Sequence, residues 1–172
     1  MARRFNQRYG RIFLECTAKV GEVGRLPGTD GKEKMSKSLG NAIELKDDPD
    51  TVRQQVRGMF TDETKLRKGD PGRPENCPVY LYHQAFGDPS TLDGRAAKCQ
   101  SGELGCVDCK RDLAEALNAF LEPIRARRTE AEKAPLGDYL REGTAKAREV
   151  AAVTMAAVRR AMHLDYSSVF GG

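Results

Sequence analysis

Apolar residues recur at helical spacing over most of the chain, and the clearest case begins near residue 48. Asp47 or Asp48 can accept hydrogen bonds from free N–H groups of a first turn, and Pro49 suits that turn because it lacks an N–H. The segment that follows places four apolar side chains on one face, namely Val52, Val56, Met59 and Phe60. This pattern predicts a helix that begins near residue 49.

Two more helices are predicted in the middle of the chain. One occupies "PVYLYHQAF", with Pro78 at its start and Gly87 just past its end. Another begins near Lys110, and Pro123 and Pro135 are expected to kink or divide it. Its apolar stripe consists of Leu113, Leu117, Phe120 and Leu121.

A last helix is predicted over about 144–163. Its apolar positions recur every three or four residues and are Ala147, Ala151, Met155, Val158 and Met162. This spacing predicts a face buried in the core. The polar segment 61–76 is rich in Gly and Pro and predicts a connector, and 88–108 predicts an irregular loop.

The first 45 residues follow a less regular pattern. "ARRFNQRYG" predicts a short helix, and "RIFLECTAKVGEV" can hold one strand and a turn ahead of a glycine-rich loop. Cys16 lies among apolar neighbours, so it is expected to be a small buried side chain. Because no strand-helix-strand unit of about 30 residues is complete here, this part is expected to be the remnant of an α/β domain.

Composition sets only broad limits on function. The 172 residues carry 29 Lys and Arg against 25 Asp and Glu, and the resulting charge of +4 suits a phosphate or nucleic-acid partner without requiring one. No apolar run approaches the roughly 18 residues that span a bilayer, and "MARRFNQRYG" lacks the apolar stretch of a secretory signal. We therefore expect a cytoplasmic protein with no membrane partner.

The cysteines are concentrated in the middle of the chain, in the spacing C-x21-C-x6-C-x2-C formed by Cys77, Cys99, Cys106 and Cys109. Clustered thiols in a cytosolic chain indicate metal rather than disulfides. Four sulfurs suit structural zinc or an iron-sulfur cluster, and the ligand type alone does not separate the two. The alternative is four unrelated buried thiols.

The glycine-rich loop "GTDGKEKMSKSLGN" concentrates cationic and hydroxyl side chains. Lys34 and Lys37 lie three residues apart beside Ser36 and Ser38, so two ammonium groups and two hydroxyls can grip a polyphosphate. The loop can open and close at Gly28, Gly31 and Gly40. Positive charge placed where a leaving pyrophosphate gains negative charge would lower a reaction barrier. Taken alone, "KMSKS" also fits a solvated surface loop.

The stretch "LPGTDGKEKMSKSLGNAI" resembles the signature loop of class I aminoacyl-tRNA synthetases, and "LPGTDG" resembles the tryptophanyl version in particular. Three further stretches resemble the helical C-terminal portion of tryptophanyl-tRNA synthetases. They are "DPGRPENCPVYLYHQAF", "GCVDCKRDLAEALNAFLEPIRARR" and "GTAKAREVA". The resemblance covers nearly the whole chain.

The resemblance implies roles for individual residues. Lys34 and Lys37 are the implied catalytic residues, with Lys37 on the ATP phosphates. The implied set for ATP, which binds with Mg²⁺, is Lys34, Met35, Ser36, Lys37 and Ser38. Within that set Met35 is expected to pack rather than to take part in the chemistry.

The resemblance also bears on the cysteines and on three arginines. Some bacterial members carry a four-cysteine pattern with one more residue in the first gap, which implies a [4Fe-4S] cluster at Cys77, Cys99, Cys106 and Cys109 and leaves Zn²⁺ as the alternative. The arginines of "PIRARR" are expected either to meet tRNA phosphates or to form a solvated helix face; they are Arg125, Arg127 and Arg128.

The implied fold is mainly α. Residues 1–45 would end a Rossmann-like α/β nucleotide-binding domain, and 46–172 would form a helical anticodon-binding domain. The implied activity is that of a tryptophan–tRNA ligase, with tRNA(Trp), tryptophan and ATP as partners and a homodimer at full length. Neither His83 nor His163 belongs to the HIGH-like motif that class I synthetases need, so the chain alone is expected to be inactive and to require a missing N-terminal half.

Two other functions fit the same residues. One is a free-standing module that binds tRNA or protein and keeps the lysine loop as a remnant. The other is a small redox carrier. It is less favoured because the predicted helices offer no site for a partner cofactor.

Overall fold

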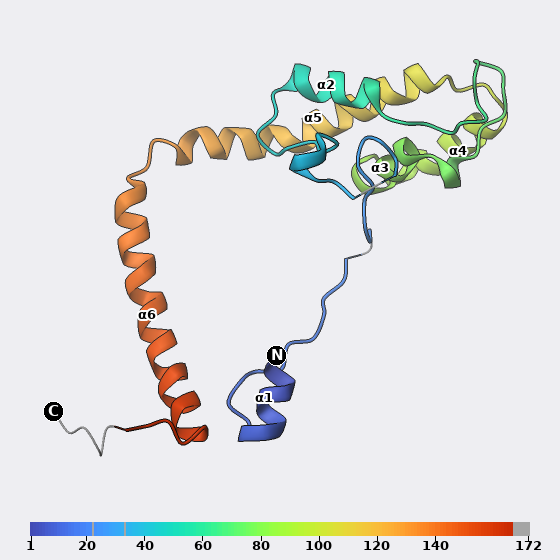
Figure 1. The fold of residues 1–172 in the computed structure, drawn as a ribbon. Helices are drawn as coiled ribbons and strands as arrows, with labels where there is room; N and C mark the ends of the chain where they lie inside the picture. The colour runs from blue at the N-terminus through green and yellow to red at the C-terminus, as the bar shows by residue number, and fades with distance from the viewer. Residues whose placement is uncertain (22, 33, 167–172) are drawn as a thin grey trace. The chain divides into compact units, whose positions relative to one another are not determined.

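Helices account for nearly all the regular structure in a computed structural model that describes residues 1–21, 23–32 and 34–166 (Figure 1). Within those ranges there is no β-strand, and the one β-bridge is an isolated antiparallel pair, Pro27 with Lys34. The expectation of a mainly α chain is therefore confirmed. The α-helices are α1 (Ala2–Tyr9), α2 (Pro49–Gly58), α3 (Pro78–Phe86), α4 (Leu92–Gln100), α5 (Cys106–Ala131) and α6 (Leu136–Ala161). Three short 3-10 helices are η1 (Lys37–Leu39), η2 (Pro74–Asn76) and η3 (Pro89–Thr91).

The chain divides into two compact units. One unit is Val20–Ala131, and the other combines Met1–Lys19 with Glu132–Gly172. The boundary expected between residues 45 and 46 stays a prediction. No helix in the described ranges is long and apolar enough to cross a membrane.

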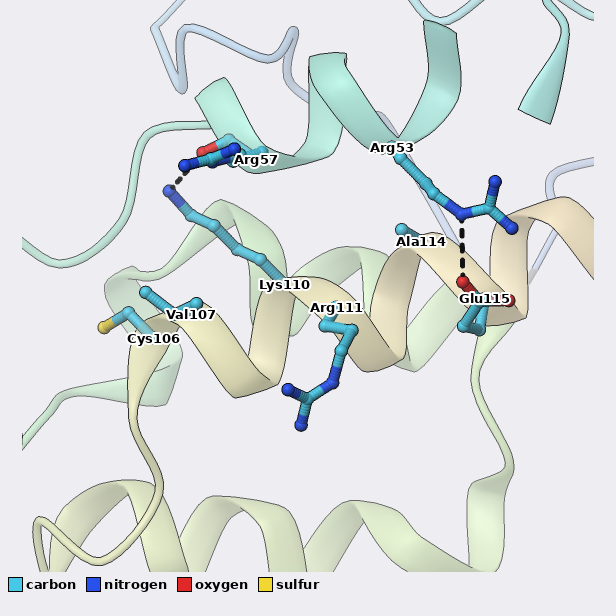
Figure 2. A pocket seen from close by; sticks show the side chains of 8 residues that line it. All are labelled: Arg53, Arg57, Cys106, Val107, Lys110, Arg111, Ala114 and Glu115. Atoms are coloured by element: carbon cyan, nitrogen blue, oxygen red, sulfur yellow. Dashed lines mark hydrogen bonds and ion pairs between the residues drawn. The ribbon is translucent and has the colours of Figure 1, made fainter. Parts of the chain in front are cut away.

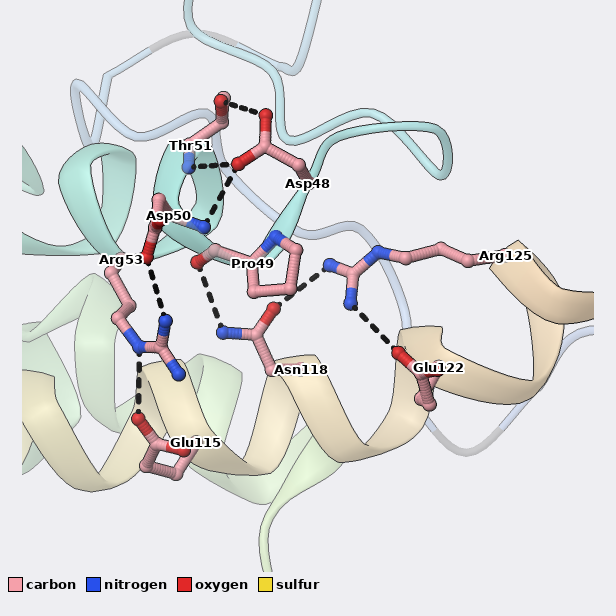
Figure 3. Close-up of polar contacts among 9 residues, drawn as sticks. All are labelled: Asp48, Pro49, Asp50, Thr51, Arg53, Glu115, Asn118, Glu122 and Arg125. Carbon is pink, nitrogen blue, oxygen red and sulfur yellow. Dashed lines mark hydrogen bonds and ion pairs between the residues drawn. The ribbon is translucent and has the colours of Figure 1, made fainter.

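Helix α2 begins where the sequence indicates. Asp48 is its N-cap, and one carboxylate oxygen accepts hydrogen bonds from the backbone N–H groups of Asp50 and Thr51, both at 2.9 Å (Figure 3). The other oxygen accepts from the Thr51 hydroxyl at 2.6 Å. These bonds satisfy N–H groups that have no partner inside the helix, which stabilises its first turn.

Helix α5 is fixed to the start of α2 by polar contacts. Asn118 donates to the Pro49 carbonyl at 3.2 Å and accepts from the Arg125 guanidinium at 2.8 Å (Figure 3). The same guanidinium donates to the Asp47 carbonyl at 2.7 Å, and its side chain is only 14% exposed. Arg125, one of the three arginines expected to meet tRNA phosphates or to form a solvated helix face, therefore joins α5 to the start of α2.

The core of the Val20–Ala131 unit lies between α2, α3 and α5. The predicted faces of α2 and α5 meet there, and Tyr82 and Val79 contribute from α3. Each large apolar side chain buried in this way stabilises the fold by about 1.5–3 kcal/mol. The core consists of Val52, Val56, Met59, Val79, Tyr82, Leu113, Ala114, Leu117 and Leu121.

Two expected elements are wrong. The segment 11–21 has no strand, and the irregular loop expected over 88–108 instead contains η3, α4 and the first turn of α5. Asp88 caps η3 by accepting from the Ser90 N–H at 2.9 Å. Gly and Pro content favours a loop here, but Pro89 lies in a first turn, where proline is tolerated, and Gly94 costs a helix only about 1 kcal/mol.

In the other unit, Asn6 organises the end of α1. Its side-chain oxygen accepts from the N–H groups of Ile12 and Phe13 at 3.1 and 2.9 Å, and Phe5 contacts Phe13 edge-on. Cys16, beyond this turn, is exposed, so the expectation that it is buried is wrong. Its apolar neighbours in sequence do not cover it, because the extended segment around it exposes Leu14 and Val20 as well.

The last helix also differs from its prediction. Pro135 divides α5 from α6 as expected, whereas α5 continues through Pro123. Of the apolar face predicted to be core, Val158 is buried and Met162 is half-buried, but Met155 is 43% exposed and Ala147 and Ala151 are exposed. Periodicity defines one face of a helix; it does not supply a surface to cover that face.

Candidate functional site: the lysine loop and the cysteine cavity

The lysine loop, residues 28–41, is organised from inside by Asn41. This side chain is buried, and its oxygen accepts from the Ser36 N–H at 2.8 Å. Its amide group donates to the Asp30 carboxylate at 2.9 Å and to the Lys34 carbonyl at 3.3 Å. Asn41 thus joins both sides of the loop, a role that the position of an asparagine after Gly40 did not reveal in the sequence.

The loop is also attached to the helical core. The Phe60 N–H donates to the Thr29 carbonyl at 2.9 Å, and the Tyr82 hydroxyl donates to the Pro27 carbonyl at 2.6 Å. Gly31 has a positive φ of 72°, and a Cβ there would lie 2.7 Å from the Phe60 ring. A larger residue at position 31 would therefore separate the loop from the core.

Some side chains of the KMSKS motif are exposed to solvent, and one packs against the core. Lys34, Lys37 and Ser38 are exposed, and the hydroxyl oxygens of Ser36 and Ser38 lie 2.8 Å apart. Met35 is half-buried and packs against the core. The ammonium groups of Lys34 and Lys37 therefore extend from a loop whose interior is already hydrogen-bonded by Asn41.

A second candidate site is the cysteine cavity, which all four clustered cysteines line. Cys77 precedes α3, Cys99 lies in the last turn of α4, and Cys106 and Cys109 lie in the first turn of α5. All four are free thiols. Three helix ends thus bring together residues that are up to 32 positions apart in sequence.

Burial and nearby charge act in opposite directions on these thiols. Burial raises the pKa of Cys99, against the opposing effect of the Lys65 charge. Burial likewise raises the pKa of Cys109 to about 11, while Arg95, which donates to its Sγ at 3.8 Å, acts to lower it. Without a ligand, both groups are protonated thiols at neutral pH.

The connector 61–76 closes over the cavity. The Gly72 N–H donates to the Cys99 carbonyl at 3.0 Å, and a Cβ on Gly72 would lie 2.6 Å from the Cys99 sulfur. Asp62 anchors the connector by accepting from the Arg73 backbone N–H at 2.7 Å and from its guanidinium at 3.1 Å. The Arg73 guanidinium holds the pKa of the Asp62 carboxyl well below its usual range.

The cavity is small as it stands. Its volume is about 20 Å³, and within the described ranges no three His, Cys, Asp or Glu side chains are arranged to hold a metal ion. The four thiols line one space without converging on one point. Arg95 also borders this space, and its buried Nε has no hydrogen-bond partner among the described residues.

The remaining sequence candidates lie elsewhere. Arg127 and Arg128 are exposed on the last turns of α5. His83 is buried and makes a 3.0 Å hydrogen bond with the Cys109 carbonyl, and burial lowers its pKa, so it joins α3 to α5. His163 follows the end of α6 with a φ of 56°.

The family comparison matches residues 1–122 to the family described as tRNA synthetases class I (W and Y). That match includes the lysine loop, the core helices and all four cavity cysteines. The chain therefore belongs to this class I synthetase family.

The individual relatives narrow the similarity to tryptophan enzymes. The chain is 49% identical over 167 residues to the tryptophan–tRNA ligase of Aquifex aeolicus and 48% identical over 169 residues to that of Treponema pallidum. These matches cover 95% and 96% of this chain but 42% and 50% of the relatives, so the chain spans about half of their length.

A solved structure agrees with this result. The crystal structure of tryptophanyl-tRNA synthetase from Campylobacter jejuni, complexed with ADP and tryptophan, matches with a TM-score of 0.70 at 31% identity. It covers 95% of this chain, which in turn covers 51% of that one.

Proposed function

We propose that this chain supplies the ATP loop and the helical, tRNA-binding part of a tryptophan–tRNA ligase. The full enzyme would join tryptophan to ATP, release pyrophosphate and transfer the tryptophanyl group to tRNA(Trp), and at full length it would be a homodimer. Support comes from the family match, from the tryptophan–tRNA ligases among the similar proteins, and from the exposed motif lysines. Activation would require residues beyond these 172, since they contain no HIGH-like motif.

In this proposal the two lysines act by charge. As the bond between the α- and β-phosphates of ATP breaks, negative charge grows on the departing pyrophosphate, and ammonium groups placed beside it stabilise the transition state. Lys37 would contact the phosphates, with Lys34, Ser36 and Ser38 in support, while Mg²⁺ accompanies the nucleotide. Met35 would anchor the motif to the core through its packing.

One observation carries the proposal, namely that Lys34 and Lys37 are exposed on a loop that Asn41 holds from inside. A solvated surface loop has no need of a buried polar anchor. Because two hydrogen bonds of this side chain fix the backbone at Lys34 and Ser36 and a third holds the Asp30 carboxylate, the backbone beneath the lysines needs little ordering when an anion arrives. Such preorganisation is what electrostatic catalysis requires.

The test is tryptophan-dependent pyrophosphate exchange in a chimera. The part of the Treponema pallidum ligase that this chain does not match would be fused to these 172 residues. We expect exchange by the chimera, a loss of roughly 100-fold or more in Lys37→Ala, and no exchange by the chain alone. Lys32→Ala, which removes a lysine of the same loop outside the motif, should change the rate less than about twofold.

Two outcomes would contradict the proposal. Robust exchange by the chain alone would show that activation needs no further residues. A full exchange rate in the Lys37→Ala chimera would show that the loop is a remnant, and would favour a module that only binds tRNA or protein.

We further propose that the cysteine cavity holds a [4Fe-4S] cluster, with Zn²⁺ as the alternative. The donor set fits, since four free thiols line one space and the unpartnered Nε of Arg95 borders it. Gly72 leaves open the place beside Cys99 that a Cβ would fill. The thiols would have to rotate to bind either group, and the bound metal would lower the raised pKa values of Cys99 and Cys109. A cluster here would bind the ends of α3, α4 and α5 together.

A further inference from the structure

Arg95 brings a charged group to the cysteine cavity. Among the described residues that line this cavity it alone carries a charge, while Thr61 and Tyr80 end in neutral hydroxyl groups. Its side chain is only 15% exposed. Because a guanidinium stays protonated at neutral pH, the cavity has a permanent cation at its edge.

Helix α4 directs Arg95 toward the sulfurs. Arg95 lies four residues before Cys99, so the two side chains share one face of the helix. Its Nη1 donates to the Cys109 sulfur at 3.8 Å and to the Asp112 carboxylate at 3.1 Å, and both partners belong to α5. The guanidinium therefore joins α4 to α5 beside two of the four thiols.

The same guanidinium also has a donor without a use in the fold. The Nε of Arg95 is buried and has no hydrogen-bond partner among the described residues. Joining α4 to α5 requires only the bond from Nη1 to Asp112, and a buried donor without a partner costs stability. A purely structural role of Arg95 therefore does not account for the position of Nε.

Lys65 is a second buried cation near these cysteines, but its donor is used. A Cβ on Gly72 would lie 2.6 Å from the Cys99 sulfur and 3.0 Å from the Lys65 side chain, so both border the same place. Lys65 is 6% exposed, and its Nζ donates to the Asp70 carbonyl inside the connector. Of the two cations, Arg95 is thus the one with a donor left for a ligand.

The chemistry of a tetrathiolate centre fits such a donor. Four thiolates carry more negative charge than one Zn²⁺ ion or one [4Fe-4S]²⁺ core neutralises, so either centre is anionic overall. A buried anion is stabilised by an opposite charge and by N–H groups that donate to it. Arg95 offers both at the sulfurs.

We propose that Arg95 is a positioning residue for the metal centre, with Nε and Nη1 donating to its sulfurs and the guanidinium balancing its charge. This inference rests on the proposed metal centre and goes further by assigning a role to a residue outside the four ligands. A cation and N–H donors at the sulfurs stabilise the more negative, reduced form of a cluster, so Arg95 raises the reduction potential.

The test is a redox titration of the full chain purified without oxygen. Dithionite supplies the electron, the [4Fe-4S]²⁺ core takes up one electron to become [4Fe-4S]⁺, and electron paramagnetic resonance measures the reduced form. Arg95→Met keeps an apolar side chain and removes the charge and the donors. It should lower the equilibrium constant of reduction roughly tenfold, which is a midpoint potential about 59 mV more negative.

Two further measurements apply if one variant or one metal is not obtained. Arg95→Lys keeps the charge without Nε, so its potential should shift in the same direction by a smaller amount. If the chain holds zinc, competition with a chelating dye replaces the titration, and Arg95→Met should weaken zinc binding roughly tenfold. Circular dichroism checks that each variant keeps its helices.

Two controls separate this role from net charge and from structure. Arg111 lies on α5 two residues after Cys109, is 66% exposed, and extends away from the helix (Figure 2). Arg111→Met removes the same charge in solvent and should change the equilibrium constant less than about twofold. Asp112→Asn breaks the ion pair between α4 and α5 but keeps the guanidinium, so it should not make the potential more negative.

The contrary results are distinguishable. An unchanged potential or zinc affinity in both Arg95 variants would overturn the role of Arg95 and leave the metal centre in place. An equal shift in Arg111→Met would show that net charge alone acts, and a more negative potential in Asp112→Asn would show that Arg95 only joins the helices. Loss of metal from Arg95→Met alone would support the role, whereas loss from Asp112→Asn as well would contradict it. If the unaltered chain holds neither iron nor zinc, both this inference and the proposed metal centre are wrong.

Discussion

The lysine loop and the cysteine cavity are both candidate ligand sites, but they differ in how complete they are without a ligand. The loop satisfies its own interior, since Asn41 makes three hydrogen bonds there, while Lys34 and Lys37 are exposed. The cavity leaves four thiols around a small space and a buried Nε on Arg95 without a partner among the described residues.

This difference indicates two ways to build a site. A loop that must bind and release ATP phosphates in each catalytic cycle gains from a frame that is stable when empty, because less conformational freedom is lost at each binding event. A permanent metal centre can instead contribute to folding itself, and its residues need no other partners. Each half of this comparison can be tested by substitution.

The largest expected effect is at Gly102, in the turn that follows α4 and its Cys99. Gly102 has a φ of 81°, and a Cβ there would lie 2.2 Å from the Gly69 carbonyl oxygen. Gly102→Ala should lower the free energy of unfolding by about 3 kcal/mol, measured by denaturant titration, because backbone rather than a flexible side chain must move. Gly94→Ala, in α4 with open space around it, should instead raise stability by about 0.5–1 kcal/mol. Equal effects of the two changes would contradict this account of the turn after α4.

A smaller effect is expected in the lysine loop. Asn41→Ala removes the partners of the Ser36 N–H, the Asp30 carboxylate and the Lys34 carbonyl, and should cost about 2 kcal/mol. The sharper readout is hydrogen exchange, which should accelerate more at the Ser36 amide than at the Leu113 amide in the core. Unchanged protection at Ser36 would mean that Asn41 does not hold the loop.

The smallest effect concerns the connector over the cavity, which Asp62 anchors through Arg73. Because the pKa of Asp62 is lowered in the folded protein, the unfolded chain takes up the proton first as the pH falls. The stability that this carboxylate contributes is therefore complete above the unfolded pKa of about 4 and is lost progressively as the pH falls from there towards the lower pKa of the folded state. The free energy of unfolding, measured from pH 7 to pH 3, should fall less steeply in Asp62→Asn than in the unaltered chain. Parallel pH profiles would exclude this role.

The sequence predicts those features that depend on local pattern. The start of α2 at Pro49, the bounds of α3 and most of the buried faces of α2 and α5 follow from capping and periodicity, and the structure confirms them. Phe120 is the exception on α5, because 49% of it is exposed. The position of the four cysteines around one cavity follows from their clustering.

Features that depend on tertiary context do not follow from the sequence pattern. The length of α4 and the exposure of Cys16 and of the α6 face depend on what packs against each segment, which periodicity does not contain. The roles of Asn41, Gly72 and Arg95 are hidden for a similar reason, because their partners lie up to 27 residues away or in another element.

The most direct test of the comparison is the metal and sulfide content of the full chain purified without oxygen. We predict iron and acid-labile sulfide in about equal amounts, absent from Cys99→Ala and retained in Cys16→Ala, whose exposed thiol lies outside the cavity. Zinc without sulfide would mean that the cavity holds Zn²⁺ rather than an iron-sulfur cluster. Neither iron nor zinc in the unaltered chain would contradict the claim that the cysteine cavity is completed by a metal centre.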